Sequence, residues 1–477
     1  MTEMRLQSVS GYLPLLRFDA KVARSELRWS GLGGSGRGHR AVAGWDEDPL
    51  TMAVEAARGA DLSVPPESVV FASTSAPFSD RSQAGVMAEA LRLPTSVLTQ
   101  DVANTRRGAV TALIRALKGG ASELIASGEK RTARPGTAQH VGWGDGAGAA
   151  LVGSGDGVAK MLGHASITAD LLDIYTSVER ATPYPSEDRF VRDAAVGEVY
   201  TPAIRAALDA AGIAAGDVAA AVVPEPVGGT YRAAAKACGL DAPNLCEEVA
   251  AKAGDLGTAM PFFCLGLALD RSKIGDRLLV AGFGNGADVL VLEVTGRGDG
   301  TASAALARGA ILTSYSRFLN LTGMLPLEYG PRAEVNQKVS ASTLLRHGRD
   351  MHGFVGGRDQ GGNVQFPKTP VPVRPDATGP EDYEDVPMTE IAAKVASITA
   401  DRLNFTPDPP FYFGLVQFEN GARVMMEHCD CEGRTPEVGE PLRMQFRIKA
   451  LDRQRHFRSY FWKAAPIARP DLPEEGK

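Results

Sequence analysis

A polar corner at residues 101–108 carries the side chains best placed to act as a nucleophile. Gly108 opens a segment whose apolar residues recur at helical spacing, namely Val110, Leu113, Ile114 and Leu117. The positive end of such a helix stabilises the anionic form of a nucleophile beside it. Asn104 and Thr105 occupy this corner, and no cysteine lies there. Because a hydroxyl needs an adjacent base to attack a substrate, Thr105 is predicted to be a corner residue bonded to the backbone.

The elements that position this corner occur twice in the chain. Residues 104–128 and 254–282 share one plan of polar corner, helix with small residues, charged break and apolar strand. A repeat of this size indicates a duplicated βαβ unit. Two like halves predict an α/β fold of five layers, αβαβα, with pseudo-twofold symmetry. Within it we expect strands at 67–72, 121–126, 218–223 and 277–283 and helices at 83–91 and 199–211.

A glycine-rich stretch, Gly31–Gly36, matches the dinucleotide-binding fingerprint letter by letter. That fingerprint requires a helix opening from its last glycine. The next predicted helix begins only near Asp48-Pro49, with the aspartate as cap and the proline in the first turn. We therefore predict a loop and no nucleotide site.

Beyond about residue 300 the composition changes toward short strands and turns. Residues 353–380 are dense in glycine and proline, whereas 390–398 and 411–418 are predicted strands. Asn420-Gly421 is a strong hairpin signal, and residues 443–449 alternate polar with apolar, which is typical of a half-buried strand. Several such strands suggest a small barrel of the OB type. We expect an α/β domain over 1–298, a helical linker over 299–345 and a mostly β domain over 346–477.

Composition narrows the range of functions. The formal net charge is −6 and the sequence pI is near 5.8, which argues against nucleic acid as the main partner. The first residues lack the apolar core of a signal peptide, and no apolar run is long enough to span a membrane. Five scattered cysteines favour reduced thiols over a disulfide framework. We expect a cytoplasmic protein with no membrane partner.

Four motifs in order carry a resemblance to a known family. They are Gly11-Tyr-Leu-Pro14, Asp46-Glu-Asp-Pro-Leu-Thr-Met-Ala53, Gly144-Asp-Gly-Ala-Gly148 and Gly282-Phe-Gly-Asn-Gly286. Through them residues 5–297 resemble the 3-hydroxy-3-methylglutaryl-CoA synthase branch of the thiolase superfamily. Residues 340–465 resemble the zinc-ribbon/OB-fold proteins that accompany thiolases, on the motifs Gly362-Asn-Val-Gln-Phe-Pro367, Pro409-Pro-Phe-Tyr-Phe-Gly-Leu-Val416 and Tyr460-Phe-Trp462.

The resemblance implies a cysteine nucleophile, a histidine, a glutamate and an asparagine, and this chain departs from all four. The glutamate position falls on Thr74, the cysteine on Thr105, the histidine on Pro224 and the asparagine on Asp255. None of the seven histidines lies in a matching motif. Glu225 stands beside the histidine position and is a candidate base, although a water-facing loop carboxylate is the favoured interpretation. We therefore expect no residue in the usual catalytic roles.

The zinc ribbon departs from its pattern as well. Its first cysteine pair falls on Arg358 and Gly361, and its second on Pro372 and Pro375. Without thiolates no zinc is expected.

The remaining candidate metal ligands lie elsewhere. Cys429 and Cys431 with His428 lack the four-ligand spacing of a structural zinc site, so no metal is expected there. Cys238 and Cys264 are interpreted as small core residues.

Three functions remain open at this point. The first is a non-catalytic subunit that forms a homodimer and supports a separate catalytic thiolase-fold enzyme through its OB module. The second is an active acyl-CoA enzyme that forms or cleaves carbon–carbon bonds, as an aldolase, a lyase or a synthase-like acyltransferase, with other residues. The third is a binding module for acyl-CoA or nucleic acid.

No tightly bound cofactor is expected, with coenzyme A or acyl-CoA as the possible ligand. The nucleic-acid version rests on the cations Arg443, Arg447, Lys449, Arg453, Arg455 and Arg458. These equally suit the phosphates of coenzyme A, and a solvated barrel face is their most frequent role.

Overall fold

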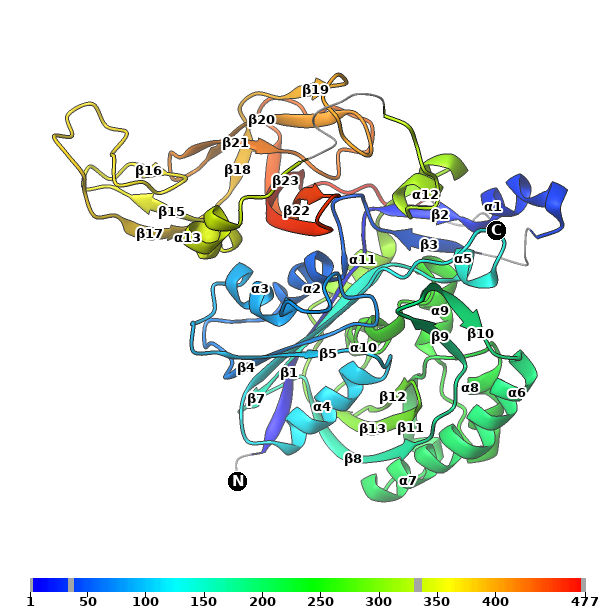
Figure 1. Ribbon diagram of the computed structural model, residues 1–477. Helices are drawn as coiled ribbons and strands as arrows, with labels where there is room; N and C mark the ends of the chain where they lie inside the picture. The colour runs from blue at the N-terminus through cyan, green and yellow to red at the C-terminus, as the bar shows by residue number, and fades with distance from the viewer. Residues whose placement is uncertain (1–2, 33–37, 330–336, 473–477) are drawn as a thin grey trace.

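A nine-stranded mixed sheet organises the computed structural model, which describes residues 3–32, 38–329 and 337–472 (Figure 1). Residues 33–37 of the glycine-rich stretch lie outside these ranges. In order across the sheet, the strands are β11 (Val218–Val222), β12 (Arg277–Phe283), β13 (Gly286–Val294), β8 (Ala159–Thr168), β1 (Met4–Tyr12), β7 (Gly146–Ser154), β6 (Glu123–Glu129), β4 (Ser68–Ala72) and β5 (Leu98–Val102).

The sheet consists of two halves that meet at β1 and β8. These two strands are joined by a single residue pair, Leu6 with Ala159. In the first half, β7 pairs with β6 antiparallel, and β6 pairs with β4 parallel. In the second half, β13 pairs with β12 antiparallel, and β12 pairs with β11 parallel. In the place corresponding to β5, the second half has only an isolated bridge from Ala221 to Asn244. The duplication predicted from the sequence is therefore present.

Helices α4 (Gly108–Lys118) and α10 (Met260–Arg271) contact strands of both halves of the sheet. Residues 260–269 of α10 are all buried, as expected of a helix whose side chains are apolar on every face. Gly148 allows its close approach, since a Cβ there would lie 2.7 Å from Cβ of Phe262.

The outer faces of the sheet are covered by other helices. Helices α2 (Pro49–Ala57) and α3 (Gln83–Ala90) pack on strands of the first half, and α7 (Thr201–Ala211) packs on β8 and β13 of the second, followed by α8 (Thr230–Cys238). As predicted, Asp48 caps α2, accepting from the backbone N–H of Thr51 at 3.0 Å.

Smaller elements surround this body. A three-stranded sheet has the order β14 (Ala310–Leu312), β2 (Leu16–Asp19) and β3 (His39–Val42), and a hairpin pairs β9 (Ile174–Ser177) with β10 (Arg180–Pro185). The rings of Phe18 and Phe318 stack with their centroids 4.0 Å apart and hold the small sheet to helix α12 (Tyr315–Leu321). The remaining helices here are α1 (Ala20–Glu26), α5 (Ala138–Gly142), α6 (Asp188–Ala194), α9 (Leu245–Ala253), α11 (Thr301–Ala307) and α12 (Tyr315–Leu321).

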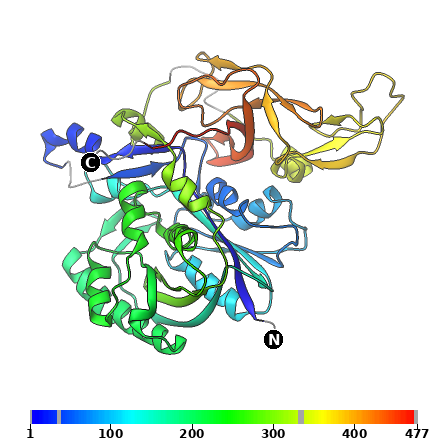
Figure 2. The same ribbon diagram turned by 180° about the vertical axis from the view of Figure 1, so that it is seen from behind.

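The C-terminal module begins with α13 (Ala341–His352) and is otherwise made of strands (Figure 2). A three-stranded ribbon has the order β16 (Val364–Gln365), β15 (Val355–Arg358) and β17 (Glu384–Pro387). A six-stranded sheet follows, in which β21 (Arg423–Glu427) pairs with β20 and the others have the order β19 (Thr399–Asp401), β20 (Phe411–Phe418), β18 (Ala393–Val395), β22 (Pro441–Asp452) and β23 (Phe457–Pro466).

Two details of this module test the sequence reading. The predicted hairpin is present, with Gly421 at φ 89° between β20 and β21. The strand predicted over 390–398 forms only at β18, because the N–H groups of Ala396 and Ser397 both donate to the carbonyl of Leu415 and end the regular ladder there.

The module and the α/β body share one continuous core. Leu50 and Met52 of α2 belong to the same buried cluster as Phe446 and Trp462. Buried ion pairs cross the same boundary, such as Arg447 Nη1 with Glu47 Oε1 at 3.1 Å. Arg447 is therefore not part of a solvated barrel face, and that interpretation is wrong for this residue, whose side chain is wholly buried.

Candidate functional site

The four positions that the resemblance assigns to catalytic groups line two cavities that share Arg106. Thr74 and Thr105 line a cavity of about 630 Å³ beside the strand corner. Pro224 and Asp255 line a second, much smaller one of about 20 Å³. Arg106 lines both, so its side chain stands between the two groups of positions.

Thr105 is held by the backbone. Its Oγ1 donates to the carbonyl of Gly284 at 3.0 Å, across from the second half of the fold. Asn104 precedes it at φ 68°, a left-handed conformation that asparagine tolerates better than most residues. This local geometry turns the chain sharply from β5 toward α4.

Glu129 is a site residue that the sequence analysis missed. This wholly buried carboxylate at the end of β6 accepts from Thr74 through its N–H at 2.8 Å and its hydroxyl at 2.9 Å. It also accepts from the hydroxyls of Ser75 at 2.5 Å and Thr258 at 2.6 Å. The predicted strand stopped at residue 126, and a longer strand reading would have placed Glu129 at its end.

Arg106 forms a charged pair inside the site. Its Nη2 lies 2.5 Å from both carboxylate oxygens of Asp173. Burial lowers the pKa of the Arg106 guanidinium, but the charges of Asp173, Asp255 and Glu129 outweigh it and hold that pKa above its usual value. Arg106 therefore stays cationic at the centre of the region.

Arg131 fixes Asp255. The Nη2 of Arg131 donates to Oδ2 of Asp255 at 3.0 Å, and its guanidinium lies over the ring of Trp143, 4.3 Å from the centroid. Burial raises the pKa of Asp255, but the Arg131 charge and the N–H of Gly257 outweigh burial and hold that pKa below its usual value. The carboxylate is thus an anion at neutral pH.

Lys130 is a half-buried cation held by backbone carbonyls. Its Nζ donates to the carbonyls of Gly44 and Glu47, both at 2.9 Å. Desolvation is the main cause of a lowered pKa for this ammonium. Lys130, Arg106 and Arg131 all line the larger cavity, together with the carboxylate of Asp173.

Apolar side chains also line the larger cavity. Most come from the β9–β10 hairpin and the residues before it, namely Leu171, Leu172, Ile174, Tyr175, Ala181 and Pro183. A cavity lined by both apolar side chains and cations suits a ligand with an acyl part and an anionic or strongly polar part.

The loop at Pro224 does not match its sequence-based interpretation. The carbonyl of Pro224 accepts from the Tyr200 hydroxyl at 2.5 Å. Glu225 is half-buried and accepts from the backbone N–H of Tyr231 at 2.7 Å, so the prediction of a water-facing carboxylate is wrong. Burial raises the pKa of Glu225, which is the direction expected of a general base.

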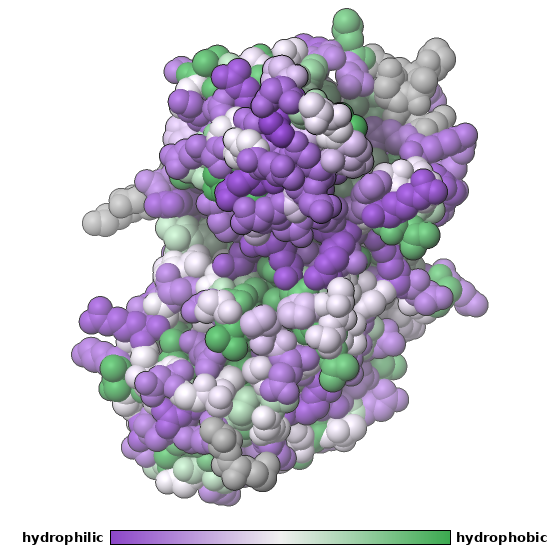
Figure 3. All heavy atoms as spheres, turned by 90° about the vertical axis from the view of Figure 1, so that its left-hand side faces the viewer, coloured by the Kyte–Doolittle hydropathy of each residue, from purple (hydrophilic) through white to green (hydrophobic). Residues whose placement is uncertain are grey.

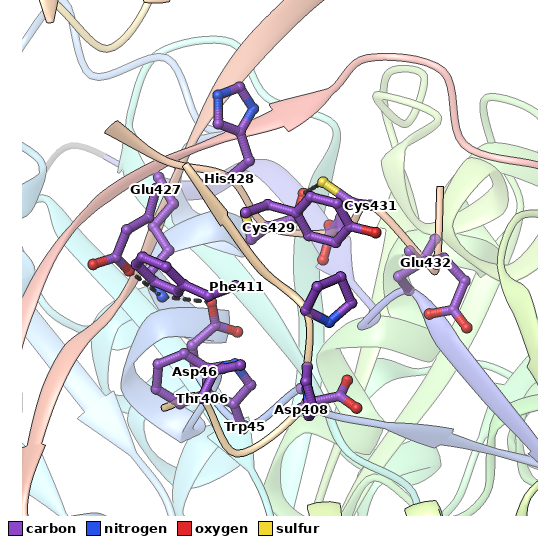
Figure 4. A pocket seen from close by; sticks show the side chains of 18 of the residues that line it. Trp45, Asp46, Thr406, Asp408, Phe411, Glu427, His428, Cys429, Cys431 and Glu432 are labelled. Atoms are coloured by element: carbon purple, nitrogen blue, oxygen red, sulfur yellow. Dashed lines mark hydrogen bonds and ion pairs between the residues drawn. The ribbon is translucent and has the colours of Figure 1, made fainter. Parts of the chain in front are cut away.

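A third cavity, under the C-terminal module, contains Cys429 and Cys431 (Figure 4). Both thiols are buried, and burial raises the pKa of Cys431 to about 12. The imidazole of His428 points away from the carboxylate of Asp46 (Figure 4). Among the described residues, no group of three or more histidine, cysteine, aspartate or glutamate side chains is arranged to hold a metal ion.

The ribbon positions hold no thiolate, and one of them, Gly361, lies beside Arg374. Arg358 pairs with Glu384 at 3.1 Å, and Pro372 and Pro375 lie on the loop that carries Arg374. A Cβ at Gly361 would lie 2.8 Å from Cδ of Arg374. The Arg374 guanidinium is surrounded by three carboxylates: it pairs with Asp376 at 2.8 Å and with Glu381, and Asp359 lies 3.9 Å from its Nε.

The duplicated sheet, the two helices between its halves and the cavity at the strand ends define the thiolase fold. The solved structure of MvaS in complex with 3-hydroxy-3-methylglutaryl coenzyme A has the same fold, with a TM-score of 0.55, 18% identity and coverage of 70% of this chain and 95% of that one. Xanthomonas campestris OleA has a TM-score of 0.53 and 17% identity, over 61% of this chain and 96% of OleA.

Sequence relatives define the family. The hydroxymethylglutaryl-CoA synthase of Aeropyrum pernix is 30% identical over 272 residues, which cover 54% of this chain and 74% of that protein. The synthase of Methanothermobacter thermautotrophicus is 28% identical over 273 residues, 54% of this chain and 77% of the relative. The chain belongs to the hydroxymethylglutaryl-CoA synthase family, as the four motifs predicted. No family model matches it.

Within the described ranges, no helix combines the length and the apolar character needed to cross a membrane.

Proposed function

We propose that the chain is a non-catalytic subunit that binds acyl-CoA, dimerises and supports a separate catalytic thiolase-fold enzyme. The observation that carries this proposal is the division of the site by Arg106. Thr74 and Thr105 lie on one side of it and Pro224 and Asp255 on the other. A condensing enzyme needs its nucleophile and its proton-transferring groups in one cavity.

The proposal includes the finer architecture. We propose a five-layer αβαβα body, supported by the contacts of α4 and α10 with both halves of the sheet. The C-terminal module is assigned as an OB-type domain with a ribbon that has lost its zinc ligands, supported by its six-stranded sheet and by the carboxylates around Arg374. We also propose a cytoplasmic location, which is supported by the five free cysteines.

Acyl-CoA binding is proposed for the larger cavity. The support is its size, its apolar lining residues, and the cations Lys130, Arg106 and Arg131 that line it. OleA has been solved with bound lauric acid and lauroyl-CoA, and MvaS with 3-hydroxy-3-methylglutaryl coenzyme A. In this chain the same fold offers the ligand a charged surface in place of a thiolate.

The second candidate function is an active acyl-CoA enzyme that forms or cleaves a carbon–carbon bond, as an aldolase, a lyase or a synthase-like acyltransferase. Glu225 favours it, because its raised pKa suits a general base. Against it, the cavity that Glu225 lines is only about 20 Å³, too small for a substrate in this conformation. A pure binding module for nucleic acid is disfavoured by the burial of Arg447.

The test combines three measurements on the full-length chain. Intact-mass spectrometry after incubation with acetyl-CoA or acetoacetyl-CoA should give an unchanged mass, while calorimetry should detect CoA binding that weakens in Arg131→Ala. Affinity purification of the tagged chain from its native cells should recover a thiolase-fold enzyme. A covalent acyl adduct, or turnover of a β-hydroxyacyl-CoA by the chain alone, would contradict the proposal and support an active acyl-CoA enzyme.

A further inference from the structure

A separate cavity of about 470 Å³ lies in the C-terminal module. It is bounded by α13, by the ribbon segment 366–369 and by strands β21, β22 and β23. Its apolar lining consists of Met351, Phe366, Met425, Met426, Phe461 and Trp462. None of its lining residues belongs to the cavity at Thr105, so it is a distinct site.

The size and lining of this cavity distinguish it from a packing defect. Voids inside native proteins rarely exceed a water molecule, whereas small-molecule sites span roughly 300 to 1,000 Å³ and are mostly apolar. Three of the six apolar lining residues are methionines, whose flexible side chains adapt to ligands of irregular shape. Seen from the side of the ribbon, the surface of the module is largely hydrophilic, so the apolar lining is not part of a generally apolar exterior (Figure 3).

Three lysines line this cavity, namely Lys368, Lys449 and Lys463, together with the carboxylates of Asp350 and Glu427. Lys368 also pairs with Asp385 at 2.7 Å and Lys463 with Asp46 at 3.0 Å, so each of the three ammonium groups has a carboxylate partner. A site for an anionic head group therefore requires a lysine that can leave its carboxylate partner.

The lysines are placed at different depths. Lys463 is buried, and its Nζ lies 2.9 Å from Glu427 and 3.0 Å from Asp46. Lys449 also pairs with Glu427 but is nearly half exposed, so its ammonium can turn toward an incoming anion without leaving water. Lys368, paired with Asp350 at 3.0 Å, lies on the ribbon side of the opening.

We propose that this cavity binds an unbranched acyl chain with an anionic head, the chain among the methionine and aromatic side chains and the head at Lys449. A free fatty acid and an acyl-CoA share this chemistry. The occupant is a ligand of the C-terminal module, in addition to the acyl-CoA proposed for the larger cavity of the α/β body.

Calorimetric titration of the full-length chain tests the proposal, with dodecanoate, dodecanol and dodecanoyl-CoA as probes. Dodecanoate should bind saturably, and dodecanol at least tenfold more weakly. Met425→Trp and Thr343→Trp fill the opening at exposed lining positions and should each weaken dodecanoate binding at least tenfold. Leu345→Trp is the matched control, since Leu345 lies on the same helix as Thr343, is 88% exposed and does not line the cavity.

Two further arms identify the head group and the site. Lys449→Glu should weaken dodecanoate binding more than dodecanol binding. Thr105→Trp, which obstructs the larger cavity, should leave dodecanoate binding unchanged whatever it does to coenzyme A binding. Tighter dodecanoyl-CoA binding that persists in Thr105→Trp would identify the thioester as the ligand, and equal affinities would identify the free acid.

The proposal is wrong if dodecanoate and dodecanoyl-CoA both fail to bind at about 1 mM. It is equally wrong if both cavity-filling variants, shown to be folded by circular dichroism, bind as the wild type does, or if Thr105→Trp abolishes dodecanoate binding. None of these outcomes bears on the non-catalytic role of the α/β body.

Discussion

At the scale of single residues, three of the four positions that the resemblance assigns to catalytic groups make specific side-chain hydrogen bonds. Thr105 is bonded to the carbonyl of Gly284, Thr74 to Glu129, and Asp255 to Arg131. Buried polar groups that are satisfied in this way stabilise one arrangement and resist a change of role. If these positions are replaced catalytic groups, as we propose, we expect that restoring one of them does not restore the chemistry.

Changing Thr105 to cysteine tests this view. The variant should form no acyl-enzyme with acetyl-CoA, because no imidazole lines either cavity in the described structure and Pro224 occupies the histidine position. Intact-mass spectrometry with iodoacetamide-treated wild type as control would detect an adduct. An acyl group on the variant would mean that the remaining residues suffice to activate a thiol.

Glu129→Gln tests the carboxylate that the sequence analysis missed. The carboxylate accepts from one backbone N–H and three hydroxyls, and an amide cannot accept from all of them. We expect the free energy of unfolding to fall by about 1 to 3 kcal/mol. Urea denaturation measures it, with Glu419→Gln as the control because Glu419 is exposed. Equal loss in both variants would contradict the role of Glu129.

The sequence predicted some of these residues and not their partners. The corner at Asn104 and Thr105 was visible because a polar turn preceded an amphipathic helix. Glu129 reaches Thr258, 129 positions later in the chain, and such long-range hydroxyl contacts leave no periodic signal. Arg106 and Asp173 are likewise brought together across 67 positions by the fold alone.

At the scale of elements, loops in the C-terminal module are held by arginines among carboxylates. Arg374→Ala should loosen the ribbon, because Asp359, Asp376 and Glu381 would then repel one another. We expect hydrogen exchange across residues 359–381 to accelerate at least tenfold, with exposed Arg358→Ala as control.

Adding EDTA to the wild type should leave its exchange unchanged. Slower exchange on adding zinc would show that the ribbon still binds metal.

Asp430 gives the module a defined acid sensitivity. Burial raises the pKa of this carboxyl, but Arg447 at 3.3 Å and Arg469 at 2.7 Å outweigh it and lower the pKa to about 2. The ordinary value in an unfolded chain is near 3.9, so this stabilisation is complete above about pH 5 and is lost as the pH falls toward 2.

The matching experiment compares the wild type with Asp430→Asn by urea denaturation at pH 7 and pH 3. The lowered pKa of Asp430 corresponds to about 2 to 3 kcal/mol of stabilisation at pH 7, part of which is lost at pH 3. The difference in free energy of unfolding between wild type and variant should therefore be smaller at pH 3. A difference independent of pH would mean that Asp430 contributes only through packing.

The sequence predicted elements correctly where residues adjacent in the chain determine them. It did not predict the ends of strands, which depend on pairing with residues far away in the chain. The cap at Asp48 and the hairpin at Asn420-Gly421 depend on residues adjacent in the chain. The extent of β18 depends on the carbonyl of Leu415, which takes two donors and ends the ladder. Arg447 looked like a surface residue because its partner, Glu47, lies 400 positions earlier in the other part of the chain.

At the scale of the whole molecule, the two parts share one buried core. Residues of α2 and of β22 and β23 belong to one buried cluster, and Asp46, Glu47 and Asp48 pair with Lys463, Arg447 and Arg458 across the boundary. Cutting the chain near residue 300 would expose these carboxylates. Point variants are therefore the cleaner test of assembly.

The proposed homodimer requires the free edge of β5. This strand pairs with β4 on one side, and its first three residues are exposed, Leu98 by 72%. An exposed edge with an apolar residue is a site for pairing with a second copy.

The N–H of Leu98 donates to Glu67 on the β4 side, so the N–H of the next residue, Thr99, points outward. Thr99→Pro removes only that outward donor and should convert the dimer to a monomer. Thr99→Ala keeps the donor and should stay dimeric. Light scattering after size exclusion measures both, and circular dichroism checks that each variant is folded. A monomeric wild type, or a proline variant that remains a dimer, would show that β5 does not form the dimer interface.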